Sequence, residues 1–548
     1  MAQVLKLTRN AVDTSLISLS GWCITDPGWT AVVGEYTPDA VPPPVVEVLT
    51  LRSYHATQDA LAAAEIALHK LGRQAAAFLR DRSEQHPVWL YDQLSSETGP
   101  RQALVLSMRL ENITEQHGIG SDGTGDHINP TALFRLAIIR GPWERTSSVA
   151  MNAATPRTIH FDSGSTEPTV GETITGNTSG DIGTAAWWFK DAGTWAGGNA
   201  DGYIVLSDAD GPFQDNEALN GSVAGNDFAT ADGTAGGGVG LVYDYSTTNP
   251  TGDMPARIAF MDFTANSSDL DRLWIGVRSE AKHPTIANYV PIWECEASTL
   301  NVLESGVTNE TGDSTASNQE YVQVVETDLD WDDTWQKVYE RQEPIDGGKE
   351  AENYGEALCL LRALVTAGTW EVQLRLQQGA SGASIEGPIV EVSNTSWDFH
   401  EAGIFQFPIR DLRVIPTGTL ADTFDANVYM TCYARRTSGA GNLKLDCFVK
   451  IPTDEAFIKV ESAGVAVSSR LIVATGPQNA TQAMSATATL FDDFGAASPS
   501  NWSLPPGDGR IFMAFARSAN STWADTVTIN TSNAGAYYPR WHTLRGAE

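Results

Sequence analysis

Hydrophobic and polar positions alternate with the period of a β-strand along most of the chain. Glycine-rich turns separate these stretches, and aromatic and β-branched residues are frequent within them. Predicted strands include 4–19, 45–53, 102–110, 132–140, 256–263, 272–278, 321–326, 357–365, 369–376, 428–435, 443–451 and 510–517. The pattern predicts a mainly β fold made of several β-sandwiches or jelly rolls.

One segment, 57–82, follows the period of a helix instead. Thr57 is a candidate N-cap, and Asp59 places negative charge in the first turn. The hydrophobic residues that recur at helical spacing are Leu61, Leu68, Leu71, Phe78 and Leu79. We expect the longest helix of the protein here, packed through this face on an amino-terminal β-sandwich.

The length of 548 residues exceeds what one hydrophobic core supports, about 250–300 residues. Turn-rich stretches divide the chain into four expected units. They are a β-sandwich with the helix (1–150), a glycine-rich β unit (151–290), a jelly roll (291–470) and a carboxy-terminal β segment (471–548). The last segment either folds alone or packs on the first unit.

The glycine-rich unit contains an internal repeat. Residues 172–180 and 217–225 both read E-x-[IL]-x-G-x-x-[SA]-G. Two copies are too few for a solenoid, so a small barrel or a stack of hairpins is expected. We predict that the copies share one backbone conformation, with Gly176 and Gly221 at matching positive-φ turns.

The chain carries a formal charge of −33, from 68 acidic and 35 basic side chains. Such a surface repels nucleic acid and anionic lipid, so neither is an expected partner. No window approaches the roughly 18 apolar residues of a membrane span. The five cysteines form no C-x-x-C motif and are expected to be reduced core residues of a protein made in a cytoplasm.

The densest acidic run is the main candidate metal site. Its carboxylates could give Ca²⁺ the hard oxygen ligands that it takes. They belong to Asp328, Asp330, Asp332 and Asp333. The spacing of an EF-hand is absent, and a solvated acidic turn is the alternative. No other cofactor is expected.

Three tryptophans, Trp331, Trp335 and Trp397, are candidates for stacking on sugar rings. The alternative is packing in the core or at the rim of a sandwich, where tryptophan is common. The chain contains no G-x-S-x-G, no H-E-x-x-H and no P-loop motif. We therefore expect a protein that is not an enzyme.

Several blocks resemble parts of tailed-bacteriophage virion proteins. The repeat region, at 170–180 and 211–225, resembles a segment of such proteins. The 1–150 unit resembles the amino-terminal part of siphophage distal-tail proteins in its strand–helix–strand order and in the block 136–143. The 291–470 unit is similar to galactose-binding-like jelly rolls through 293–297, 397–403 and 445–455.

These resemblances imply a structural component of a phage tail or tail tip, such as a distal or minor tail protein. It would be made in the host cytoplasm and reside in the virion as a homo-oligomeric ring. Outward sandwiches would contact other virion tail proteins or a host surface glycan. The alternatives are a carbohydrate-binding adhesin or depolymerase, and a capsid decoration protein.

Overall fold

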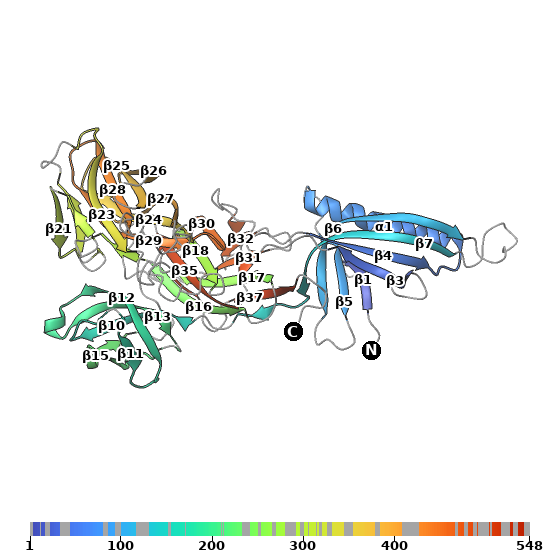
Figure 1. Ribbon diagram of the computed structural model, residues 1–548, viewed down its shortest axis with the longest axis horizontal. Coiled ribbons are helices and arrows are strands. Elements are labelled where there is room, and N and C mark those ends of the chain that lie inside the picture. Colours follow the sequence, from blue (N-terminus) through green and yellow to red (C-terminus); the bar gives the residue numbers. More distant parts are fainter. Residues whose placement is uncertain are drawn as a thin grey trace, which may run out of the picture.

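The structure is a computed structural model of the chain, and it confirms a mainly β protein of several units (Figure 1). It describes residues 4–10, 12–16, 22–32, 44–80, 86–93, 100–116, 131–151, 155–169, 171–209, 211, 213–232, 242–249, 254–265, 270–279, 292–295, 301–304, 306–313, 315–316, 320–325, 331–344, 355–378, 384–407, 427–465, 470–475, 481–485, 490–491, 503–504, 507–516, 527–529 and 535–541.

The amino-terminal sheet is antiparallel, with the strand order β2-β1-β5-β6-β7-β4-β3. Its strands are β1 (Val4–Arg9), β2 (Val12–Ser15), β3 (Trp22–Val32), β4 (Val45–Ser53), β5 (Trp89–Gln93), β6 (Arg101–Gln116) and β7 (Thr131–Arg145). β4 alternates between buried and partly exposed positions, as expected of a strand with one covered face. The described strands of this unit form one sheet, and a helix covers it.

Helix α1 (Gln58–Arg80) is the one α-helix among the described residues and lies on the predicted segment. The hydroxyl of Thr57 accepts a hydrogen bond from the backbone N–H of Ala60 at 3.1 Å, as expected of an N-cap. Leu61 and Leu68 are buried against the sheet, whereas Leu71 and Phe78 are half-buried. Gly72 is also buried, and the helix approaches β6 so closely there that a Cβ would lie 3.0 Å from the carbonyl oxygen of Met108.

The glycine-rich region forms a closed barrel with the order β10-β13-β12-β11-β14-β15. Its strands are β10 (Thr158–Gly164), β11 (Thr173–Gly176), β12 (Ile182–Ala192), β13 (Ala200–Ala209), β14 (Ala218–Gly221) and β15 (Gly225–Ala231), with a 3₁₀ turn η1 (Trp195–Gly197). The two repeats pair with each other through β11 and β14. Their hydrogen bonds match: Asn177 N–H donates to the Ala218 carbonyl, and Ser222 N–H to that of Thr173.

The prediction of positive φ at Gly176 and Gly221 is wrong. Positive φ occurs at the last glycine of each repeat, Gly180 (75°) and Gly225 (97°). Gly176 is needed for space instead, because a Cβ there would lie 2.6 Å from a carboxylate oxygen of Glu217. At Gly221 it would lie 2.7 Å from one of Glu172. Each glycine therefore makes room for the glutamate of the other repeat.

A central sheet joins segments far apart in the sequence, in the order β30-β18-β35-β16-β9. Its strands are β9 (Thr155–Pro156), β16 (Val242–Asn249), β18 (Leu270–Ser279), β30 (Ala456–Val465) and β35 (Gly507–Ala516). Beside it, β17 (Met254–Ala265) pairs with β31 (Arg470–Thr475), β34 (Ser503–Leu504), β36 (Val527–Ile529) and β37 (Gly535–Trp541), while β32 (Thr481–Ser485) and β33 (Leu490–Phe491) extend β31.

These pairings differ from the division into consecutive units. The barrel ends at Ala231, and strands from 242–279 pair with strands from 456–541. The 471–548 segment therefore does not stand alone in the structure. Its last strand, β37, pairs with β7 and β8 (Val149–Ala150), which connects the amino-terminal sheet to the rest of the molecule (Figure 1).

Residues 292–452 form a β-sandwich. The inner sheet has the order β21-β22-β29-β24-β27, with β19 beside β29. The inner strands are β19 (Ile292–Glu294), β21 (Val307–Thr311), β22 (Glu320–Val324), β24 (Gly355–Val365), β27 (Asp398–Phe407) and β29 (Leu443–Pro452). The outer sheet has the order β20-β23-β28-β25-β26, with β20 (Asn301–Leu303), β23 (Gln336–Pro344), β25 (Thr369–Gln378), β26 (Ser384–Val392) and β28 (Asn427–Ser438).

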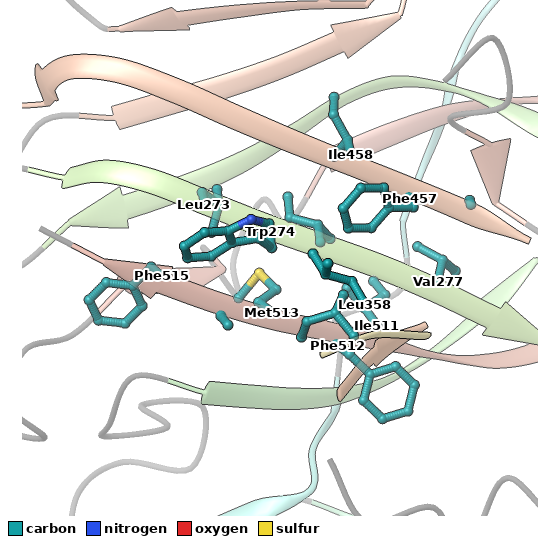
Figure 2. Packing of buried hydrophobic residues seen from close by; sticks show 14 of the residues in the cluster. Leu273, Trp274, Val277, Leu358, Phe457, Ile458, Ile511, Phe512, Met513 and Phe515 are labelled. Carbon is teal, nitrogen blue, oxygen red and sulfur yellow. The ribbon is translucent and has the colours of Figure 1, made fainter. Parts of the chain in front are cut away.

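The inner sheet is buried on both faces. One face packs on the outer sheet through a cluster that includes Cys359, Trp370 and Phe448. The other face packs on the central sheet. Figure 2 shows Leu358 of β24 in one cluster with Trp274 of β18 and Met513 of β35. This is why nearly every position of β24 and β29 is buried.

Candidate functional site

The outer sheet is where the sandwich leaves a face available. Among the described residues, hydrophobic clusters cover both faces of the inner sheet but only one face of the outer sheet. Side chains alternate along a strand, so β25 and β28 send every second residue to the uncovered face. This surface, here called the outer face, is the candidate functional site.

Polar and aromatic side chains occupy the outer face in register. The pairing of β25 with β28 places Glu371 opposite Arg435, Gln373 opposite Tyr433, and Arg375 opposite Thr431. Directly opposite residues of an antiparallel pair share a face and lie close together. On the far side of β25, Glu391, Ile389 and Glu386 of β26 continue the three rows.

Arg375 and Tyr433 form the middle of the outer face. The guanidinium carbon of Arg375 lies 4.1 Å from the centre of the Tyr433 ring. Its Nη2 donates to Oε1 of Gln373 at 3.1 Å, and its Nη1 lies 3.4 Å from a carboxylate oxygen of Glu386. The Gln373 amide in turn donates to the carbonyl of Gly387 at 3.0 Å. The tyrosine and its polar neighbours are thus held in fixed positions.

A second pair repeats this arrangement at the end of β28. Arg435 donates from Nε to Glu371 at 2.7 Å, and its Nη2 lies 2.6 Å from the same oxygen. Its guanidinium carbon lies 4.8 Å from the centre of the Trp335 ring. Both charged side chains remain about a quarter exposed, at 28% for Arg435 and 23% for Glu371. They are therefore accessible to a bound molecule.

Lys337 of β23 completes the outer face beside Tyr433. Its Nζ lies 2.6 Å from Glu304 and 3.6 Å from Glu340. The hydrogen bond to Glu304 raises the pKa of Lys337, and the charges of both carboxylates add to this against the opposing effect of burial. The ammonium group is thus held in its charged form.

This arrangement suits a ligand rich in hydroxyl groups. Aromatic rings offer apolar faces on which the C–H groups of a sugar ring can stack. Hydroxyls both donate and accept hydrogen bonds, and the partly exposed guanidinium and carboxylate groups supply complementary partners. The outer face has both features within one set of adjacent side chains, and these side chains belong to paired strands of one sheet.

Two of the three predicted sugar-stacking tryptophans lie in the core. Trp331 is 1% exposed and packs against Trp370, with ring centres 5.8 Å apart. Trp397 is 3% exposed, and its indole N–H donates to the hydroxyl of Thr315 at 3.1 Å. Neither ring presents a face to a ligand, so both are reassigned to packing. Trp335 is half-buried at the outer face and stays a candidate.

The acidic run does not form a cation site in the part that the structure describes. Asp328 and Asp330 lie outside the described residues. Asp332 pairs with Arg436, whose Nη2 lies 2.5 Å from its carboxylate, and Asp333 occupies a turn at φ 53°. Among the described residues, no group of three or more His, Cys, Asp or Glu side chains is arranged to hold a metal ion.

The predicted site residues do not include Tyr433, Arg375, Gln373, Arg435 or Glu371. A signal for them exists in the strict alternation of β25, which reads T-W-E-V-Q-L-R-L-Q-Q. The polar positions of that strand identify an exposed face. They do not reveal that Tyr433, from a strand more than fifty residues later, lies beside them.

Comparison with known proteins adds two remote likenesses. No protein-family profile and no curated protein sequence matches the chain. The carbohydrate-binding module TmCBM61, solved with β-1,4-galactotriose, is 14% identical, with 32% of this chain and 99% of the module covered at a TM-score of 0.17. An exo-β-1,3-galactanase from Phanerochaete chrysosporium, solved with β-1,3-galactotriose, is 9% identical, with coverages of 67% and 78% and a TM-score of 0.15. Superpositions of this quality carry no weight for the function of this chain.

Proposed function

We propose that the chain binds glycans through the outer face of its sandwich. The observation that carries this proposal is the row in which Tyr433 lies between Lys337 and Gln373, with Arg375 against its ring. An aromatic ring beside fixed hydrogen-bond donors and acceptors suits the recognition of a sugar ring. Binding is proposed without a catalytic step.

A glycan array followed by titration calorimetry tests this proposal. Tyr433→Ala should weaken binding of the best glycan at least tenfold, because the variant loses the ring and leaves Arg375 without its support. Tyr54→Ala is the matched control, since Tyr54 is 38% exposed and follows β4 of the amino-terminal sheet, outside the sandwich. The proposal fails if no glycan binds, or if both variants bind like the wild type.

A second candidate, from a different class, is a structural subunit of a phage tail. The amino-terminal sheet favours it: among the described strands, β2 pairs only with β1 and β3 only with β4, so both lateral edges are open. Open strand edges accept a strand from a neighbouring subunit. A ring closed by such contacts would carry the sandwich outward, where its outer face would meet a host surface glycan or another virion protein.

Assembly of subunits into a ring is tested on the full-length protein by light scattering at low and high salt. Subunits of charge −33 repel each other, so salt should strengthen assembly by screening that repulsion. If the protein stays monomeric at high protein concentration at both salt concentrations, the model of a subunit ring is wrong. Antibody labelling of purified virions then separates a tail position from a capsid position, and labelling of neither contradicts a virion role.

In the part of the chain that the structure describes, no helix is long and apolar enough to cross a membrane.

A further inference from the structure

The charges of the outer face point to the class of glycan that it accepts. Among the described residues, its cationic side chains are Lys337, Arg375 and Arg435. Its carboxylates are more numerous: Glu304, Glu340, Glu371, Glu386 and Glu391. Resting on the proposed glycan binding, we propose that the outer face selects uncharged glycans and excludes uronate, sialylated, sulfated and phosphorylated ones.

Each cation of the outer face already has a carboxylate partner. Arg435 contacts Glu371 at 2.6 Å, and Lys337 contacts Glu304 at 2.6 Å. Arg375 has Glu386 at 3.4 Å. An anionic sugar group would have to displace one of these carboxylates or bind beside it, and in both cases it would lie close to that negative charge. Like charges at such distances repel, and more strongly in a partly buried setting than in water.

The rest of the molecule reinforces this selection. The net charge of −33 gives the whole surface a negative potential, which lowers the local concentration of anionic ligands at low ionic strength. A neutral glycan pays no such penalty. Its hydroxyls can donate to the carboxylates and accept from the guanidinium groups, so they use both halves of each ion pair without breaking it.

The decisive comparison uses two polymers that share a backbone and differ in the carboxylate, such as β-linked mannan and mannuronan oligosaccharides. It is run beside a wider array of neutral and anionic glycans. The wild type should bind its best neutral glycan at least tenfold more tightly than any anionic one, and Tyr433→Ala should weaken that binding at least tenfold.

A charge variant adds a readout that a purely structural role would not change. Glu371→Gln leaves Arg435 without its carboxylate, so binding of uronate or sulfated glycans should increase several-fold and become salt-sensitive. Glu167→Gln changes the net charge by the same amount on an exposed barrel position and should leave the selectivity as it is.

The possible results separate the two proposals. Preference for an anionic glycan that Tyr433→Ala abolishes would overturn the selectivity and leave glycan binding by the outer face in place. Equal gains of anionic binding in Glu371→Gln and Glu167→Gln would also overturn it, because the effect would then come from net charge alone. No glycan binding by the wild type would overturn both.

Discussion

Glu172 and Glu217 show how single residues hold the barrel together. Each is almost fully buried, and each accepts hydrogen bonds from the turn of the other repeat. Glu172 accepts from the backbone of Val223 at 2.8 Å and Ala224 at 2.9 Å. Glu217 accepts from Thr178 at 3.0 Å and Ser179 at 2.8 Å. A buried carboxylate is acceptable here because backbone donors satisfy it.

Glu217→Gln should lower the free energy of unfolding by about 1–3 kcal/mol, because the amide presents a donor to buried donors. Burial raises the pKa of Glu217, but hydrogen bonds from Ser179, Gln214 and Thr178 outweigh it and lower that pKa. The stabilisation is therefore present above the ordinary pKa of a glutamate and is lost as pH falls through the lowered value. Denaturant unfolding of the wild type and the variant at a series of pH values measures this pH dependence of the free energy of unfolding.

The control for that measurement is Glu167→Gln at an exposed position of the same region, where stability should change by less than about 0.5 kcal/mol. Equal stability of the Glu217→Gln variant and the wild type would show that the reciprocal hydrogen bonds contribute nothing. Glu172→Gln should reproduce the loss, since the two repeats use the same contacts.

His160 joins the strands that close the barrel. Its ring nitrogens lie 3.0 Å from Asp201 and 3.0 Å from Asp232. The Tyr203 ring packs beside it, with ring centres 4.9 Å apart. Burial lowers the pKa of His160, but the hydrogen bond to Asp201 and the charges of both aspartates outweigh it, so the pKa is raised.

A raised folded-state pKa gives a stabilisation that is complete below the ordinary pKa of histidine and is lost as pH rises through the folded value. Because both aspartates are partly exposed, we expect a loss of up to about 1 kcal/mol. His160→Asn should remove this pH dependence, which chemical denaturation between acid and mildly alkaline pH would detect. His69→Asn, on the exposed side of α1, is the control and should keep it.

At the scale of elements, α1 is stabilised by packing more than by its own sequence. Its apolar face contacts the sheet through Leu61, Leu68 and Ala75, which are buried in the amino-terminal core. Gly72 costs helix propensity but allows the helix to approach β6 closely. A helix of this kind depends on the sheet for its stability.

Leu68→Asp should destabilise the amino-terminal unit by more than about 4 kcal/mol, because Leu68 is fully buried and the aspartate would be unpaired. Loss of soluble expression, or a large fall in melting temperature, is the expected observation. Ile66→Asp on the same helix is a matched control, since Ile66 is 63% exposed. If the two variants behave alike, the assignment of the buried face is wrong.

For the whole molecule, β37 is the connection between the amino-terminal sheet and the rest. Trp541 at its end is 2% exposed in the amino-terminal core, and the guanidinium carbon of Arg101 lies 4.3 Å from the centre of its ring. Nearby, buried Glu144 of β7 contacts Arg257 of β17 at 2.7 Å and Arg540 of β37 at 3.5 Å. One carboxylate thus links three strands from distant parts of the sequence.

Trp541→Ala should cost about 3–5 kcal/mol, as truncation of a buried tryptophan does. The loss should fall on the amino-terminal unit, so limited proteolysis should cut that unit first. Trp335→Ala removes a half-buried ring from the outer face and should leave the proteolysis pattern unchanged. Equal resistance of all three proteins would show that β37 does not stabilise the first unit.

The sequence by itself determined the features that depend on local periodicity. Alternation predicted the mainly β fold, helical spacing and Thr57 predicted α1, and the repeated E-x-[IL]-x-G pattern predicted two equivalent segments. These features depend on the directions in which successive side chains point along a strand or a helix. A short stretch of sequence is enough to reveal that periodicity. The polar positions of β25 belong to the same kind of information.

Only the tertiary structure decided the features that depend on which strands pair. It placed β35, from the end of the chain, between β16 and β18, and it covered Trp331 and Trp397 while leaving Trp335 half-exposed. It also placed Tyr433 beside Gln373 and Arg375. Strand pairing joins residues far apart in sequence, and burial depends on what packs against each face, so local pattern could not reveal the outer face.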